Sequence, residues 1–182
     1  DWWCQGYSEP GAGSDLAALK TRAVRDGGYY IVNGSKTWTT LAQHADMMFC
    51  LVRTDVNEKP QQGISFLLLD MNTPGITRRP IVTMDGSHEI NEVFFEDVRV
   101  PVSGLIGKEN EGWTYAKVLL GHERSGIAGV ARSQQQIERL KKLAAGANEG
   151  GRPLLEDPDF SHKLAALEVE LLALEYTDLR TL

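Results

Sequence analysis

The hydrophobic pattern of the chain changes at Pro101, and this change constrains the fold more than any other feature. Before Pro101, short runs rich in β-branched and aromatic residues alternate with turns that carry Gly, Pro, Asn or Asp. After it, apolar residues recur at intervals of three, four or seven, which is helical spacing, and no proline follows until Pro153. The pattern therefore predicts an antiparallel β-sandwich or barrel followed by helices, an α+β chain.

The part before Pro101 predicts a series of strands. We expect strands over residues 18–25, 47–53, 64–70, 76–82, 91–96 and 98–100. The β-prone runs 29–32 and 35–40 are separated by Asn33-Gly34. Because both central residues of a type I′ turn need a positive φ, Asn-Gly predicts a hairpin turn there.

The part after Pro101 predicts two helices. The first begins near Gly112 and ends at the Gly-Gly-Arg-Pro sequence 150–153. Gly121, Gly126 and Gly129 lie inside it, and each costs about 1 kcal/mol relative to Ala. Either close helix packing or the approach of a ligand to the backbone explains them.

The second helix is predicted after Asp157, which is expected to cap it. Its apolar residues alternate in steps of four and three, and this stripe is predicted to be core. The stripe consists of Phe160, Leu164, Leu167, Leu171 and Leu174.

Composition excludes several classes of protein. The chain has 182 residues, a net charge of −6 and no long basic run, which argues against a nucleic-acid partner. Its apolar runs are too short to span a bilayer, and it opens without a signal peptide, so we expect a cytoplasmic protein. Cys4 and Cys50 lack metal-ligand spacing and are expected to be buried thiols, with a disulfide as the alternative. Both ends look cut, so we expect a piece of a longer protein.

The segment Tyr7–Asp15 (YSEPGAGSD) is a weak candidate for a phosphate site. Gly11 and Gly13 leave backbone N–H groups uncovered, and such groups form anion-binding nests. Ser14 or Asp15 is a candidate cap for a following helical turn, whose N-terminus would favour an anion. A polar surface loop is the alternative.

Three motifs, in order, resemble the acyl-CoA dehydrogenase family. They are Tyr7–Asp15, Gly34–Thr40 (GSKTWTT) and Phe95–Pro101 (FEDVRVP), the last followed by Glu111-Gly112-Trp113. Ser8 stands where the family usually has Thr. Within the family, the likeness is greatest to the branch of the large subunit of bacterial pimeloyl-CoA dehydrogenase.

The resemblance implies a division into parts of two domains. Residues 1–108 are expected to be the family's middle β domain, which faces flavin and CoA. Residues 109–182 are expected to start the C-terminal helical domain, with two long helices of an incomplete four-helix bundle. The N-terminal helical domain would be absent.

The resemblance also implies an FAD site. Its residues would be Gln5, Gly6, Tyr7, Ser8, Trp38, Thr39 and Thr40. Trp38 would shield the flavin, and Thr40 would hydrogen-bond near the nitrogen that accepts the hydride. Neighbours on a strand face opposite sides, so one of the two threonines is expected to be an ordinary strand residue. A hairpin Trp with no ligand is the alternative for Trp38.

For the substrate, the resemblance implies that Glu123 removes the α-proton of an acyl-CoA. Ser14 would lie by the pyrophosphates and the CoA arm, and Gly121, His122 and Arg124 would lie on the substrate side. A solvated Glu123–Arg124 pair is the alternative, and the family also has members whose base lies on a later loop. No metal site is expected.

The implied reaction is the dehydrogenation of an acyl-CoA to a trans-2-enoyl-CoA, with electron-transfer flavoprotein as the electron acceptor. A homo- or hetero-oligomer is expected. The sequence 149–155 (EGGRPLL) lacks the Arg, aromatic residue and Gly with which the family reaches the FAD of a neighbouring subunit, which favours a paralogous partner subunit. A flavin monooxygenase or oxidase of the same fold and a non-catalytic partner subunit are the alternatives.

Overall fold

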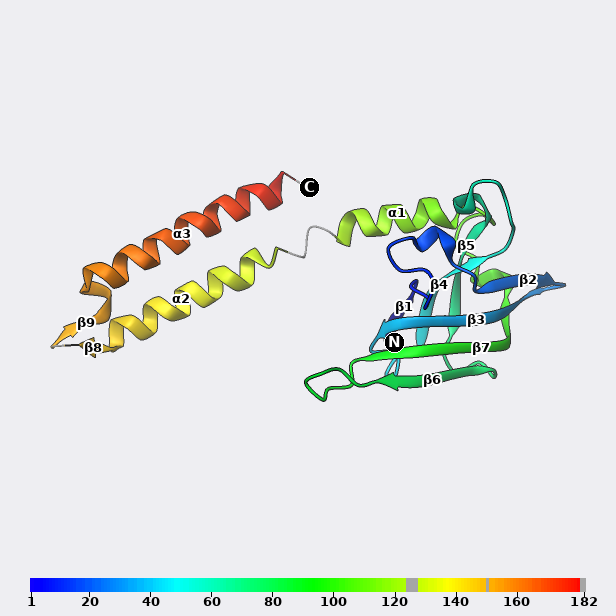
Figure 1. The fold of residues 1–182 in the computed structure, drawn as a ribbon, viewed down its shortest axis with the longest axis horizontal. Coiled ribbons are helices and arrows are strands. Elements are labelled where there is room, and N and C mark those ends of the chain that lie inside the picture. The colour runs from blue at the N-terminus through cyan, green and yellow to red at the C-terminus, as the bar shows by residue number, and fades with distance from the viewer. Residues whose placement is uncertain (124–127, 150, 181–182) are drawn as a thin grey trace. The chain divides into compact units, whose positions relative to one another are not determined.

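The structure, a computed structural model, describes residues 1–123, 128–149 and 151–180. They fall into two compact units, Asp1–Val118 and Leu119–Leu182. The first unit holds a curled β-sheet, and the second holds a pair of helices (Figure 1). The predicted α+β architecture is confirmed, while the domain boundary after residue 108 stays a prediction.

One sheet dominates the first unit. Its strands are β1 (Trp3–Gly6), β2 (Arg22–Asp26), β3 (Tyr29–Thr40), β4 (Met47–Arg53), β5 (Ile64–Asp70), β6 (Ile76–Ile81) and β7 (Ile90–Pro101). They follow the order β1-β4-β2-β3-β7-β6, and β5 also pairs with β4. The pairing is largely antiparallel as predicted, but β1 and β2 run parallel to β4.

The core of this unit includes both cysteines. Cys4 and Cys50 pack with fully buried side chains such as Val32, Met48 and Leu67. Neither cysteine forms a disulfide, as predicted. Burial raises the pKa of Cys4 to about 12 and that of Cys50 to about 11, so both stay protonated and inert at neutral pH.

The predicted hairpin at Asn33-Gly34 is wrong. Both residues lie inside β3, and the two-residue turn is Gly27-Gly28, because Asp26 pairs with Tyr29. Gly34 is required for a different reason. A Cβ there would stand 2.7 Å from the Thr21 Cα, and its φ is +144°. The β3–β7 register shifts between Val32 and Gly34, so this glycine marks a bulge.

Two other strand predictions need correction. Residues 18–21 of the predicted strand precede β2, and Leu16–Ala18 form a 3₁₀ turn. The two runs predicted around Asp97 are one strand, β7, in which Asp97 has a φ of +49°. Asn33 accepts from the Asp97 N–H at 2.9 Å and donates to its carboxylate at 3.0 Å, which stabilises this irregular point.

Three helices follow the sheet: α1 (Gly112–Glu123), α2 (Val130–Gly146) and α3 (Pro158–Leu179). The prediction of one helix up to residue 150 is wrong, because Gly129 adopts a left-handed φ of +59° immediately before α2. A Cβ at Gly121 would meet nothing within 4 Å among the described residues. Gly126 lies outside the described residues. Short strands β8 (Asn148–Glu149) and β9 (Arg152–Pro153) form a hairpin between α2 and α3.

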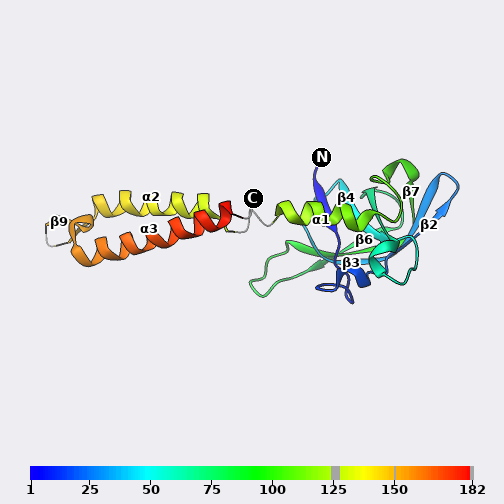
Figure 2. The same ribbon diagram turned by 90° about the horizontal axis from the view of Figure 1, so that it is seen from above.

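Helices α2 and α3 lie side by side (Figure 2). The predicted cap is confirmed, because the Asp157 carboxylate accepts from the Phe160 N–H at 2.8 Å. The apolar stripe of α3 is only partly core: Leu164 is buried, but Leu167 and Leu174 are 48% and 40% exposed. One neighbouring helix cannot cover the whole stripe. Within the described part of the chain, no helix is both long and apolar enough to cross a bilayer.

We predict that Gly34→Ala destabilises the protein by about 2 kcal/mol, because the new methyl group meets the Thr21 backbone. Gly28→Ala is the matched control, since its Cβ would meet nothing within 4 Å, and it should change stability by less than about 0.5 kcal/mol. Urea unfolding of the full-length protein measures both. Equal stability of the two variants would contradict the close approach of Gly34 and Thr21.

Candidate functional site

A loop of the first unit leaves the sheet after β1 and returns at β2. β1 pairs with residues 47–50 of β4, and β2 joins the end of the same strand, where Arg22 pairs with Arg53. The loop between them, residues 7–21, contains the first of the three motifs. Strand pairing with β4 therefore holds both ends of this loop.

A buried ion pair closes the base of the loop. Glu9 Oε1 lies 2.8 Å from Lys36 Nζ, and the two side chains are 7% and 0% exposed. The Glu9 carboxylate also accepts from the backbone N–H groups of Lys20 at 2.6 Å and Thr21 at 2.9 Å. Lys36 Nζ donates in addition to the Tyr7 carbonyl at 3.1 Å. The pair thus ties both ends of the loop to β3.

Opposing effects act on the Glu9 carboxyl. Burial by itself raises its pKa, because a charge is disfavoured away from water. The nearby Lys36 ammonium and the hydrogen bonds from Lys36, Thr21 and Lys20 outweigh burial, so the pKa lies below its usual value. Glu9 is therefore a fixed anion at neutral pH and is unsuited to act as a base.

The ion pair brings the first two motifs side by side. The Thr37 N–H donates to the Ser8 carbonyl at 2.9 Å. Thr37 follows Lys36 in the chain, and Ser8 precedes Glu9. Ser8 is half-buried, and the Trp38 side chain is 61% exposed. The backbone of Ser8 is therefore joined to β3 at the residue before Trp38.

The two threonines after Trp38 face opposite sides, as predicted. Thr39 is 1% exposed, and its Oγ1 has no hydrogen-bond partner among the described residues. Thr40 is exposed. Thr40 is therefore the threonine that a ligand can reach, and Thr39 is the ordinary strand residue.

The three residues before Ser8 contribute in different ways. Gln5 is half-buried, whereas a Cβ at Gly6 would stand 2.5 Å from Met48 Sδ in the core. The Tyr7 ring is buried and meets Phe49 and Phe66 edge to face, with centroids 5.9 and 6.1 Å away. Gly6 and Tyr7 therefore support the loop mainly by packing. Their contact with FAD stays a prediction.

The glycine end of the loop does not form the predicted helix start. Leu16–Ala18 make only one 3₁₀ turn, and the Asp15 side chain makes no capping hydrogen bond. Gly11 and Gly13 lack the left-handed φ that a backbone nest uses. The predicted helix start and backbone nest are therefore wrong, and phosphate binding by this loop stays a prediction. Ser14 is exposed, and its role toward the CoA arm stays a prediction.

The proposed base lies on helix α1. Gly121, His122 and Glu123 are its last three residues, and all three are exposed. Arg124 lies outside the described residues. Their roles toward the substrate stay predictions.

The sequence reasoning missed Glu9 and Lys36 as residues that organise the site. A signal for them was present, because each is a charged residue in the middle of a motif whose neighbours are small, aromatic or β-prone. What the pattern did not reveal is their mutual contact across 27 positions. Among the described residues, no group of His, Cys, Asp and Glu side chains could hold a metal ion.

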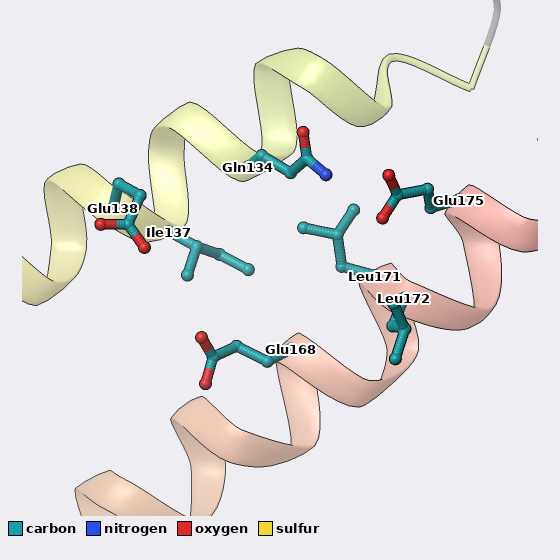
Figure 3. Close-up of a pocket in the computed structure, with 7 residues that line it drawn as sticks. All are labelled: Gln134, Ile137, Glu138, Glu168, Leu171, Leu172 and Glu175. Atoms are coloured by element: carbon teal, nitrogen blue, oxygen red, sulfur yellow. The ribbon is translucent and has the colours of Figure 1, made fainter.

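The second unit carries an apolar groove between α2 and α3. Ile137 of α2 and Leu171 of α3 point into it from opposite sides, and Glu138 and Glu168 lie at its edge (Figure 3). Lys141 stabilises the helix pair, since its ammonium lies 2.9 Å from Glu138 and 2.6 Å from Glu168. Of the predicted stripe only Leu171 lines this groove, and no candidate catalytic residue lines it.

Comparison with known proteins identifies the class to which this fold and these motifs belong. Residues 4–98 match the family described as acyl-CoA dehydrogenase, middle domain, and residues 110–182 match acyl-CoA dehydrogenase, C-terminal domain. The chain therefore belongs to the acyl-CoA dehydrogenase family.

Particular relatives cover most of this chain. Acyl-CoA dehydrogenase FadE29 of Mycobacterium tuberculosis is 41% identical over 89% of it, and cyclohexane-1-carbonyl-CoA dehydrogenase of Syntrophus aciditrophicus is 39% identical over 83%. Among solved structures, the ChsE4-ChsE5 complex of Mycobacterium tuberculosis has a TM-score of 0.82 at 37% identity, covering 98% of this chain and 46% of that one. The chain spans 42% and 41% of the two curated relatives.

We predict that breaking the buried ion pair from one side is more harmful than removing it. Lys36→Met or Glu9→Gln alone should destabilise the protein by about 3 kcal/mol, because one buried partner remains uncompensated. The double variant should recover part of this loss. Lys108→Met, which breaks the exposed Lys108–Glu111 pair, is the control and should cost less than about 1 kcal/mol. Urea unfolding measures all four variants, and additive losses in the double variant would contradict direct coupling.

Proposed function

We propose that the full-length protein is an FAD-dependent acyl-CoA dehydrogenase that converts an acyl-CoA thioester to a trans-2-enoyl-CoA. Family membership supports the reaction class. The observation that carries the proposal for this chain is the pairing of its first two motifs through Glu9–Lys36 and Ser8–Thr37. Two segments that the family uses at its flavin are therefore rigidly joined here.

The residues of this chain fit a flavin. Trp38, with a side chain that is 61% exposed, and exposed Thr40 offer a flat apolar surface and a hydroxyl, and half-buried Ser8 is joined to the residue before Trp38. Bound FAD would accept the hydride that leaves the β-carbon of the acyl group. The Thr40 and Ser8 hydroxyls would donate hydrogen bonds to the ring and stabilise the negative charge that develops there. Trp38 would cover the ring and exclude water.

The proton half of the reaction is assigned to Glu123. Its carboxylate would take the α-proton, so that the α C–H electron pair enters the new carbon–carbon double bond while the β C–H pair leaves as the hydride. Glu123 is exposed on its own helix and is accessible to a ligand. Glu9 also carries a carboxylate and lies in the first motif, but its buried ion pair with Lys36 makes it unavailable for this step.

The relatives suggest that the protein works in an assembly. One similar structure is a complex of two differently named chains, ChsE4 and ChsE5. The chain lacks the family's Arg, aromatic and Gly pattern between α2 and α3. We therefore include a paralogous partner subunit in the proposal, with electron-transfer flavoprotein as the acceptor of the electrons. A non-catalytic role in such a pair is the second candidate function.

We predict that acyl-CoA bleaches the flavin absorbance of the full-length protein, with its partner subunit where one co-purifies, in the absence of oxygen. Glu123→Gln should slow this bleaching by at least about 100-fold, because the base is lost. Glu138→Gln, which changes an exposed helical carboxylate on α2, is the matched control and should leave the rate unchanged. Bleaching that persists in Glu123→Gln would show that another residue is the base. Wild-type FAD that no acyl-CoA reduces would favour the non-catalytic role.

We predict opposite outcomes for the two neighbouring threonines. Thr40→Val should slow flavin reduction about tenfold, because the hydroxyl that stabilises the reduced ring is lost. Thr39→Val should leave that rate unchanged and should not lower stability, because its buried hydroxyl has no partner among the described residues. Stopped-flow absorbance and urea unfolding measure the two effects. A larger kinetic effect of Thr39→Val would reverse the assignment.

A further inference from the structure

Strand β3 contains one residue more than its partner β7 beside the proposed flavin surface. Lys36 pairs with Val93 and Thr39 pairs with Asn91, so Thr37 and Trp38 together stand opposite the single residue between those partners. This arrangement is a β-bulge.

The bulge decides which side chains face outward. In a regular strand, residues three apart face opposite sides of the sheet. Lys36 and Thr39 are three apart, yet both side chains are buried, with 0% and 1% exposure. The extra residue therefore shifts the alternation, and Trp38 and Thr40 become the outward pair.

This conformation needs support from its surroundings. Trp38 has a φ of +58° and Leu41 a φ of +55°, and bulky residues rarely adopt a left-handed backbone. Such conformations persist where neighbouring structure fixes them, and they cluster at functional sites. On the Lys36 side of the bulge, the buried ion pair with Glu9 supplies this support.

On the other side of the bulge, the support comes from Asn91. Its side chain is 1% exposed, and its Nδ2 donates to the Thr39 carbonyl at 3.2 Å and to Gln43 Oε1 at 2.6 Å. Its Oδ1 lies 2.8 Å from His88 Nε2, which donates because a carboxamide oxygen only accepts. Gln43 Nε2 in turn donates to the His88 carbonyl at 3.0 Å. The carboxamide thus connects the residue after the bulge to two further segments.

We propose that Asn91 is a positioning residue that fixes the Thr37–Trp38 bulge and so directs Trp38 and Thr40 toward FAD. Asn91 itself is buried and acts through β3 rather than by touching the ligand. The FAD part of this inference rests on the proposed function. The effect on Trp38 does not, since it is a property of the chain alone.

The test compares Asn91→Ala with Ser65→Ala in the full-length protein. Ser65 is also fully buried and hydrogen-bonded, to Thr54 at 2.6 Å and the Asn110 N–H at 2.8 Å, but it lies on β5. Each variant is also made with Trp38→Phe, so that the difference isolates the acrylamide quenching of Trp38. Titration with FAD gives the dissociation constant.

Asn91→Ala should change the quenching of Trp38 and weaken FAD binding about tenfold, the loss expected for removing a buried hydrogen-bonding group. Ser65→Ala should lower the melting temperature but leave both signals as in the wild type. Unchanged Trp38 quenching in Asn91→Ala, or equal changes in the two variants, would overturn the proposal.

A milder variant covers the case in which Asn91→Ala does not fold. Gln43→Ala removes one acceptor of the Asn91 carboxamide and should shift both signals in the same direction by a smaller amount. Wild-type quenching in Gln43→Ala would then count against the network. A wild type that binds no FAD would contradict the proposed function, while the quenching data would still decide the role of Asn91.

Discussion

The buried Glu9–Lys36 ion pair is the interaction on which the candidate site depends. Two charges that are almost fully removed from water are stable only when they meet each other and further hydrogen-bonding groups. Here the remaining partners are backbone groups at both ends of the loop 7–21. The requirement to satisfy the charges therefore fixes the loop and β3 together. Beside this contact, the backbone of Ser8 is joined to Thr37, the residue before Trp38.

The pattern of apolar and capping residues along the chain predicted several elements correctly. Strands β4 and β5 occupy the residues predicted from their apolar runs, and α3 begins after its predicted cap. The prediction of a hairpin at Asn33-Gly34 was wrong because long-range contacts determine that position. There β3 continues along β7, and Gly34 leaves space for the backbone of Thr21. A sequence window contains the turn propensity of Asn-Gly but not the neighbour that removes the need for a turn.

The candidate site was predicted in part for the same reason. The motifs named Ser8, Trp38 and Thr40, of which the structure leaves Trp38 and Thr40 exposed and Ser8 half-buried. The residues that hold them, Glu9 and Lys36, act through pairing between segments, which spacing along the chain does not encode. The predicted nest failed because two glycines provide an open backbone only as a possibility, and their actual φ values decide whether a nest forms.

The bulge in β3 shows why composition alone cannot assign the ligand-facing threonine. Thr39 and Thr40 are chemically identical neighbours, and a regular strand starting from buried Lys36 would turn Thr40 inward. One extra residue reverses this order without changing any side chain. The accessible hydroxyl is therefore a property of the register between β3 and β7. Buried groups that hold this register therefore help to decide which hydroxyl is accessible.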